Sequence, residues 1–313
     1  MRTPYRVLIA APLALALIAG CGKSGDTLSP TASSSNVAEQ TEVTQELATN
    51  PTLVEDGGLS AIGDQTNASL SAGNPAIASV AAVIRPLFFF RTIRDIDRHV
   101  VIDFAGNDST GHPTIAYIKV ERTLHGSFNI VVPDSGSGGG LGDAALLRKP
   151  LVDRWVRHLV AERVSGDSNN HRRWRIVGTS SVQVTSKDAT TAIHSVHVQG
   201  AGLDTTLTDP LQVFRLRNVL KVTPDVDVTI TVTTGKPDDV VLLYAADRRF
   251  RFTPNGDGTY TGTWRSPMLA GCRHVGINAL SNGTLFDDAM PYDSQAWIIP
   301  YVVTGTDLEH DPS

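Results

Sequence analysis

The chain has 313 residues, a formal net charge of −5 and two cysteines. This charge balance gives no reason to expect nucleic acid as a partner, because nucleic-acid-binding proteins carry a clear excess of basic residues. Two cysteines also exclude a small fold that is held together by several disulfides.

The first twenty residues have the pattern of an export signal. Arg2 and Arg6 precede the apolar stretch VLIAAPLALALIAG (7–20), which is shorter than the about 20 residues that span a bilayer. Cys21 follows directly after two small residues. This junction resembles the lipobox of bacterial lipoproteins, which implies that residues 1–20 are a signal peptide and that Cys21 is lipidated.

The lipoprotein resemblance implies a location in the cell envelope, with the membrane as a partner through the lipid on Cys21. Several acyl chains anchor a protein much more firmly than one chain does. Gly22, rather than an aspartate, follows the cysteine and favours the outer membrane if the host has one. The alternative is an ordinary secretory signal with an incidental cysteine.

Residues 21–75 are expected to form a disordered tether. They contain one lysine, seven acidic residues and no aromatic residue, and they show no sustained apolar period. Such a segment cannot bury enough apolar surface to offset its chain entropy. A flexible chain of this length has a root-mean-square reach of roughly 40 Å, so it would hold the folded part near the membrane.

Residues 76–222 are expected to form a β-rich basic domain, with 18 basic residues, 14 of them arginine, against 13 acidic ones. Segment 150–164 leaves two possibilities open: a helix on the sheet, which would make the domain α+β, or one arm of a hairpin with residues 172–184. The stretch DSGSGGGLGD (134–143) is expected to be a flexible loop. Strands are predicted at 99–104, 114–132, 172–186, 192–199 and 211–222.

Residues 223–304 are expected to form a second domain, a β-sandwich, and residues 305–313 an acidic tail. Pro224 interrupts the apolar alternation at the proposed boundary. Short strands that are separated by turn residues are typical of sandwiches. Strands are predicted here at 226–234, 239–246, 250–252, 259–264, 272–280 and 295–303.

The stretch TPNGDGTYTGTW (253–264) has some features of a calcium loop. Asn255 and Asp257 would suit positions 3 and 5 of an EF-type loop with Gly258 at position 6. Positions 1 and 12 would then be threonine and tryptophan, so the strongest carboxylate ligands are missing. Asn-Gly and Asp-Gly tolerate positive φ in tight turns. We therefore predict a turn, and we expect no metal or cofactor.

The sequence NGDGTYTGTW continues through Ser266-Pro267 and Ala270-Gly271 into RHVGINAL. This order of glycine-rich turn, alternating strand, corner and final apolar strand resembles the C-terminal half of a filamin-type immunoglobulin-like repeat. Trp264 and an extra loop before residues 295–303 depart from that pattern. The resemblance implies a sandwich fold and a spacer or binding role rather than catalysis.

Sequence motifs for catalysis are missing: the chain has no Gly-x-Ser-x-Gly, no Ser-x-x-Lys, no Walker loop and no His-Glu-x-x-His. His194 and His197 form the closest histidine pair, but residues three apart in a strand point to opposite faces. Cys272 stands among apolar residues and is expected to be a small buried core residue. No catalytic residue is therefore predicted.

Arginines supply the first group of candidate ligand-binding residues. If residues 150–164 and 172–184 pair, they form a cationic face whose forked donors suit carboxylates or phosphates, as in an acidic protein or an anionic glycan. The alternative is that these cations pair within the molecule, with the acidic tether and the acidic C-terminal domain. The candidates are Arg154, Arg157, Arg172, Arg173 and Arg175, with Trp174 among them.

Tyr292 and Trp297 are the second group of candidates, because they stand beside Asp287, Asp288 and Asp293. Aromatic rings next to acids on a loop could bind sugar or calcium. The alternative is an acidic surface loop.

The fold class predicted is mainly β, with a C-terminal immunoglobulin-like sandwich after a β-rich domain. The function favoured is a lipid-anchored, non-catalytic binding or assembly module of the envelope, with an envelope protein or an anionic glycan as partner. Two other classes stay open: a hydrolase of envelope glycans with the sandwich as an accessory domain, and a purely structural spacer.

Overall fold

The fold, in a computed structural model, consists mostly of antiparallel strands, with three α-helices and one 3-10 helix in the described part of the chain. The prediction of a mainly β fold is confirmed. The predicted signal peptide, the loop 134–143 and the tail 305–313 lie outside the described residues. The described residues are 34–59, 64–65, 84–133, 144–164, 173–245 and 248–304.

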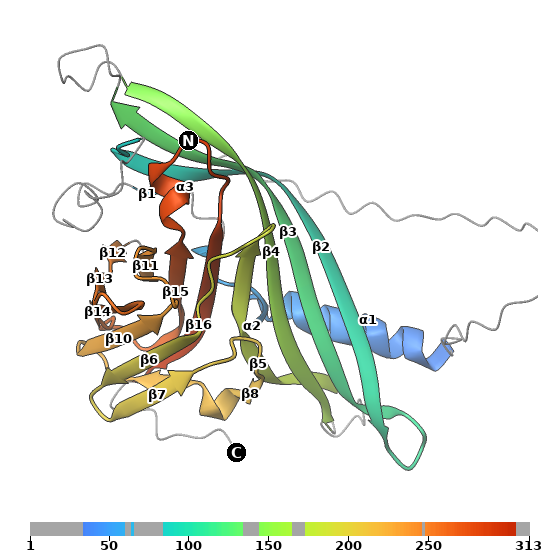
Figure 1. The fold of residues 1–313 in the computed structure, drawn as a ribbon. Coiled ribbons are helices and arrows are strands. Elements are labelled where there is room, and N and C mark those ends of the chain that lie inside the picture. Colours follow the sequence, from blue (N-terminus) through green and yellow to red (C-terminus); the bar gives the residue numbers. More distant parts are fainter. Residues whose placement is uncertain are drawn as a thin grey trace, which may run out of the picture.

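Four long strands follow one another along the chain and pair as antiparallel neighbours. Figure 1 shows β2, β3 and β4 running along the molecule and bending as they go. Residues 150–164 lie in β4 and pair with β5, so the hairpin interpretation of this segment is confirmed and the helical one is wrong. The strands are β2 (Phe88–Asn107), β3 (Pro113–Pro133), β4 (Ala144–Val164) and β5 (Arg173–Ser186).

Strand β4 resembled a helix in sequence because it carries apolar residues on both faces. The odd-numbered residues from Leu151 to Ala161 are all buried, as a strand with one inward face requires. Val156 on the other face is also buried, and Val152 and Val160 are half-buried. Apolar residues on two faces of a strand reproduce the i, i+3, i+4 spacing of a helix.

The first sheet has 11 strands in the order β1-β2-β3-β4-β5-β16-β15-β11-β12, with β8 on β5 and β9 on β16. The strand predicted at 211–222 is split, because the one-turn helix η3 (Leu216–Asn218) separates β8 (Phe214–Arg215) from β9 (Leu220–Val222). The remaining strands are β1 (Asp64–Gln65), β11 (Val240–Ala245), β12 (Arg248–Arg251), β15 (Gly271–Leu280) and β16 (Ser294–Val303).

The second sheet has five strands in the order β13-β14-β10-β6-β7. Strands β6 and β7 precede the boundary predicted near residue 222, yet β6 pairs with β10 beyond it. In the first sheet β5 pairs with β16 in the same way. Residues from both predicted domains therefore share both sheets. The strands are β6 (Ser195–Gly200), β7 (Leu203–Leu207), β10 (Asp227–Thr233), β13 (Thr253–Pro254) and β14 (Thr259–Arg265).

One hydrophobic core lies between the two sheets. Val196, Ile230 and Tyr260 of the second sheet pack in one cluster with Ile277 and Trp297 of the first. All five residues are at most 1% exposed. This face-to-face packing of two sheets fixes the positions of β15 and β16; the immunoglobulin-like assignment stays a prediction.

The first sheet is buried on its other face as well. All six residues of β11 are buried. Val241 and Leu243 belong to the core between the sheets, whereas Leu242 packs with Phe128 and Leu151 of the long strands. Strands near opposite ends of one sheet thus contact each other, so the sheet curls. We call the enclosed side of β2–β5 and β16 the inner face.

Residues 34–59, which lie in the predicted tether, pack on this inner face. Helix α1 (Ser34–Thr49) and the short helix α2 (Pro51–Val54) bury Val43, Leu47 and Val54 in a cluster with residues of β3, β4 and β5. The prediction of disorder is therefore wrong for residues 34–59. The buried stripe of α1 is only one residue wide, at 39, 43 and 47, and one of its members is Glu39. Such a stripe gives no apolar period in sequence.

The turn predicted at residues 255–258 is confirmed, since it joins β13 to β14 in a hairpin. Gly256 and Gly258 have φ of +89° and +84°. Asp257 accepts hydrogen bonds from the N–H and hydroxyl of Thr259, so its carboxylate closes the turn. No group of three metal-ligating side chains occurs in the described part of the chain.

Cys272 is exposed, which corrects the prediction of a buried core residue. It is the second residue of β15, and the continuously buried part of that strand begins only at Val275. The apolar neighbours that suggested burial lie further along the same strand.

Helices in the described part are all too short or too polar to cross a membrane.

Candidate functional site

The inner face of β4 carries polar side chains at alternate positions. Asp153, Trp155 and Arg157 occupy successive inward positions and are at most 1% exposed. A buried polar group is costly unless it finds a hydrogen-bond partner. These residues find their partners in the docked segment 34–59 and in a second cluster beside it.

Glu39 of α1 anchors the helix to the inner face. Its Oε2 accepts a hydrogen bond of 2.8 Å from the indole N–H of Trp174, and its Oε1 lies 2.9 Å from Nη1 of Arg163. Further along α1, Oε1 of Glu46 accepts from the backbone N–H of Ile176 at 3.3 Å. Two carboxylates of α1 are therefore bound by hydrogen bonds from β5, and Glu39 also forms an ion pair with Arg163 of β4.

Residues 53–56 are held on the inner face by three side chains that donate hydrogen bonds. The guanidinium of Arg157 donates to the carbonyls of Leu53 at 2.9 Å and Glu55 at 2.7 Å. Trp155 donates its indole N–H to Oδ2 of Asp56 at 3.1 Å. Arg122 pairs with the carboxylate of Glu55 and stacks over the Trp155 ring, 4.5 Å from its centroid.

His274 lies against this arrangement and is neutral at physiological pH. Burial, and then the charge of Arg157, lower the pKa of His274 to about 4. A neutral ring nitrogen can accept a hydrogen bond, and Nε2 of His274 lies 3.2 Å from Nη2 of Arg157. Burial lowers the pKa of Arg157 to about 10, so that its guanidinium stays charged at neutral pH.

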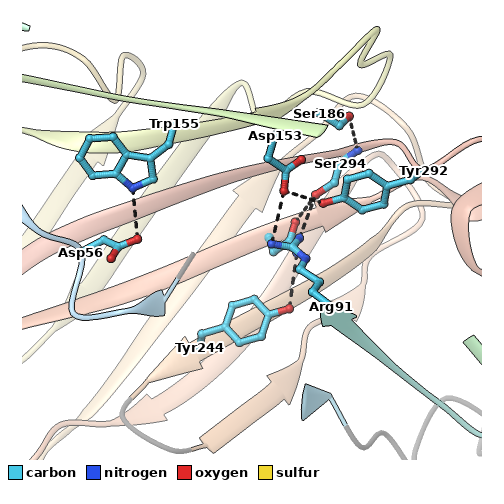
Figure 2. Close-up of polar contacts among 9 residues, drawn as sticks. Asp56, Arg91, Asp153, Trp155, Ser186, Tyr244, Tyr292 and Ser294 are labelled. Carbon is cyan, nitrogen blue, oxygen red and sulfur yellow. Dashed lines mark hydrogen bonds and ion pairs between the residues drawn. The ribbon is translucent and has the colours of Figure 1, made fainter. Parts of the chain in front are cut away.

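A second polar cluster lies beside these contacts, as Figure 2 shows. Arg91 forms an ion pair with Asp153 at 3.8 Å, and the hydroxyl of Tyr292 donates to Oδ2 of Asp153 at 3.1 Å. Ser294 donates to Asn278 at 2.6 Å and lies within 3.5 Å of the Arg91 guanidinium. Residues of β2, β4, β15 and β16 are thereby joined.

Burial and charge act in opposite directions on the pKa of Asp153 in this second cluster. Burial raises the pKa of Asp153, and the neighbouring guanidinium of Arg91 opposes that effect. Burial also raises the pKa of Tyr292, so the phenol keeps its proton and can donate it. Arg91, Asp153 and Tyr292 are 6%, 1% and 5% exposed, so solvent and substrates do not reach them.

The predicted arginine set is divided between two faces. Arg157 and Trp174 lie inside, whereas Arg154 and Arg175 are exposed on the outside. Arg154 pairs with Glu121 there. Arg172 and the side chain of Arg173 lie outside the described residues. Arg157 donates to the main-chain carbonyls of Leu53 and Glu55, so these partners within the molecule lie in the segment predicted to be the tether.

Tyr292 and Trp297 do not form an exposed platform. Trp297 is 1% exposed and lies in the core between the sheets, while Tyr292 points into the second cluster. Binding to sugar by stacking needs a free ring face. The prediction of a sugar site on these two rings is therefore not supported by their positions.

Sequence reasoning missed Arg91, Arg122, Asp153 and Trp155. A signal was present in the sequence LVDRWVRHL (151–159), where Asp153, Trp155 and Arg157 recur with period two between Leu151 and Leu159. In a strand this spacing puts all of them on the face that also holds the leucines. The partners of Trp155 and Arg157 in residues 53–56, and those of Asp153 in the second cluster, could not be found without the fold.

Three further segments meet at the carboxylates of Asp239 and Asp293. Asp293 accepts hydrogen bonds from the backbone N–H groups of Thr190 and Thr191 at 3.0 and 3.1 Å. The Thr191 hydroxyl lies 3.3 Å from Asp293 and 3.5 Å from Asp239. Oδ2 of Asp239 has no hydrogen-bond partner in the described part of the chain, and burial raises the pKa of Asp239 to about 6.

Compared with family models, curated proteins and solved structures, the chain matches none of them.

The function must therefore be argued from the contacts between the inner face and residues 34–59. Two indoles and three guanidiniums converge on one acidic peptide segment, from strands β3, β4 and β5. Charge-assisted and bidentate donors of this kind recognise carboxylates and main-chain carbonyls. The arrangement can hold a peptide, and its ionisable groups are already bound to one another.

Proposed function

We propose that this chain is a lipid-anchored, non-catalytic binding or assembly module of the cell envelope, in the outer membrane if the host has one. Support for the anchor comes from the lipobox-like junction at Cys21. Support for a binding role comes from the inner face, whose indole and guanidinium donors hold the acidic segment 34–59.

A hydrolase is less well supported. Glycosidases need two carboxyl groups that face each other across an accessible cleft. Asp153 is buried and paired with Arg91, and Asp293 is bound by the N–H groups of two threonines. Neither carboxylate is available to a sugar in this arrangement.

The docked segment also bears on where the module would work. Only 12 residues separate Cys21 from Ser34, the first residue of α1. A fully extended chain of that length reaches about 40 Å. The folded body would therefore stay closer to the membrane surface than a tether of residues 21–75 would allow.

The proposal is tested by crosslinking the tagged, full-length protein in its host and purifying it with whatever is bound. We expect one abundant envelope protein to accompany the wild type and the Cys272→Ala variant, and to be lost from Cys21→Ala. Purified protein should release no soluble fragments from isolated cell-wall glycan. Absence of any protein partner would contradict the binding role, and glycan release would favour the hydrolase.

A further inference from the structure

A groove of about 560 Å³ runs along the outer edge of the second sheet. One wall is β7, with Leu203, Thr205 and Leu207 turned toward the groove, and the floor is formed by Ile299 and Pro300 of β16. The opposite wall is the stretch from 212 to 221, which contains η3. Grooves of this volume are in the range of ligand sites in proteins.

Strand β7 is an edge strand, and Figure 1 shows it as the outermost strand of the second sheet. In the described part of the chain it pairs only with β6. Gly200 and Leu203 flank a two-residue turn, in which Gly202 has a φ of +83°. The pair that closes such a turn is hydrogen-bonded.

Hydrogen-bonded pairs alternate along an antiparallel ladder, so the direction of each main-chain group in β7 follows from this turn. Leu203, Thr205 and Leu207 direct their N–H and C=O groups to β6. Asp204 and Thr206 direct theirs away from it, toward the free edge. Both residues are exposed. An edge that presents free N–H and C=O groups is a template for one more strand.

Charges on the rim indicate what kind of strand would fit. Arg217 and Lys221 line the groove, are exposed, and form no ion pair in the described part of the chain. Asp209 also lines the groove and accepts a hydrogen bond of 2.8 Å from the backbone N–H of Leu211, while Asp204 pairs with His197 at 2.7 Å. The groove lining thus carries two cations against one carboxylate. The rim therefore favours an acidic occupant.

We propose that the groove binds an extended segment of another envelope protein, which pairs with the free edge of β7. Its main chain bonds to Asp204 and Thr206, alternate apolar side chains cover Ile299 and Leu203, and an acidic residue meets Arg217 or Lys221. This inference rests on the proposed binding function and names the site and the partner chemistry.

The first step of the test identifies what lies in the groove. A photo-crosslinking amino acid is placed at Gln212, on the groove wall, in the full-length protein in its host. The same amino acid at Asp257, in the exposed turn between β13 and β14, is the control. We expect an envelope protein to crosslink only from Gln212, through a segment that contains Asp or Glu.

The second step uses a synthetic peptide of that crosslinked segment. Its binding to the purified chain should slow backbone amide exchange at Thr206 and Asp204. Thr206→Pro removes the outward N–H but no hydrogen bond to β6, so the fold should persist while the peptide is lost. Arg217→Ser with Lys221→Ser should weaken binding by about fivefold, and Arg215→Ser, which pairs with Glu162 outside the groove, should not.

Several results would overturn the inference. In the crosslinking step, these are a crosslink from Gln212 to a second copy, to glycan or to residues 305–313, or no crosslink from Gln212. In the peptide step, it is unchanged binding by both Thr206→Pro and the double variant. Thermal unfolding checks that each variant is folded. If Thr206→Pro does not fold, peptide binding by the double variant, Arg217→Ser with Lys221→Ser, tests the inference instead. If a partner crosslinks from Asp257 but not from Gln212, the binding function stands and the groove assignment fails. If affinity purification also finds no partner, both fail.

Discussion

At the residue scale, Trp155 and Trp297 are equally buried but differ in one hydrogen bond. The indole N–H of Trp155 donates to Asp56, whereas that of Trp297 has no partner in the described part of the chain. Replacement of either residue by phenylalanine removes similar volume. We expect Trp155→Phe to lower the free energy of unfolding by about 1–2 kcal/mol more than Trp297→Phe does, because Asp56 loses a donor.

Urea denaturation of the two variants measures this difference directly. Equal losses for Trp155→Phe and Trp297→Phe would mean that the bond to Asp56 contributes nothing to stability. Residues 53–56 would then be held by Arg157 and Arg122 alone.

Asp239 makes stability depend on pH. Its pKa is raised to about 6 in the folded state by burial, against an ordinary value of 3.8. The unfolded chain therefore loses this proton at lower pH than the folded chain does, and ionisation disfavours folding. The Asp239 carboxyl should therefore make the free energy of unfolding fall as pH rises from about 4 to about 6.

Asp239→Asn should remove that contribution and be more stable than the wild type at pH 7. Asp238→Asn, a change at the exposed neighbour, should leave the slope in place. Denaturation curves at several pH values test the prediction, and an unchanged slope in Asp239→Asn would show that Asp239 ionises normally.

At the element scale, the β13–β14 turn allows two glycines of similar φ to be compared. A Cβ at Gly258 would lie 3.0 Å from the carbonyl carbon of Gly235, whereas a Cβ at Gly256 would meet nothing within 4 Å. Gly256→Ala should cost about 1 kcal/mol from left-handed strain alone, and Gly258→Ala about 2–3 kcal/mol. Thermal unfolding measures both, and equal costs would mean that the contact with Gly235 relaxes freely.

Helix α1 should remain helical only while it is docked, because an isolated helix of 16 residues is marginal in water. Val43 is 0% exposed and Val37 is 57% exposed. Val43→Asp should therefore speed amide exchange in residues 38–49 by at least about tenfold, whereas Val37→Asp should not. Slow exchange in Val43→Asp would contradict docking through this stripe.

Turns and strands were predicted correctly where the residues of the segment itself determine its conformation. Asn255 and the glycines at 256 and 258 predicted the turn, and period-two alternation predicted β10 and β14. Strand β4 stayed ambiguous because both of its faces are partly apolar. Helix α1 was missed because its buried stripe includes Glu39, whose partners Trp174 and Arg163 are more than 100 residues away in the chain.

At the scale of the whole molecule, strand order could not be predicted. Nothing in the sequence indicates that β5 pairs with β16, or that β6 pairs with β10 across the expected boundary. The pairing of β5 with β16 helps to form the inner face on which residues 34–59 pack. Two of the three predicted arginines whose side chains are described, Arg154 and Arg175, face outward. Arg122 and Trp155, which no motif marked, lie at the centre of the contact with residues 53–56.

Lipid attachment at Cys21 is the central claim, since it decides the compartment and the distance of the folded body from the membrane. Intact-mass measurement of protein extracted from host membranes tests it most directly, with Cys272→Ala as the matched control, because Cys272 is the only other cysteine. We expect the wild type and Cys272→Ala to lack residues 1–20 and to carry acyl chains, and Cys21→Ala to carry none. An unmodified Cys21 in membrane-extracted protein, or a retained signal, would contradict the claim.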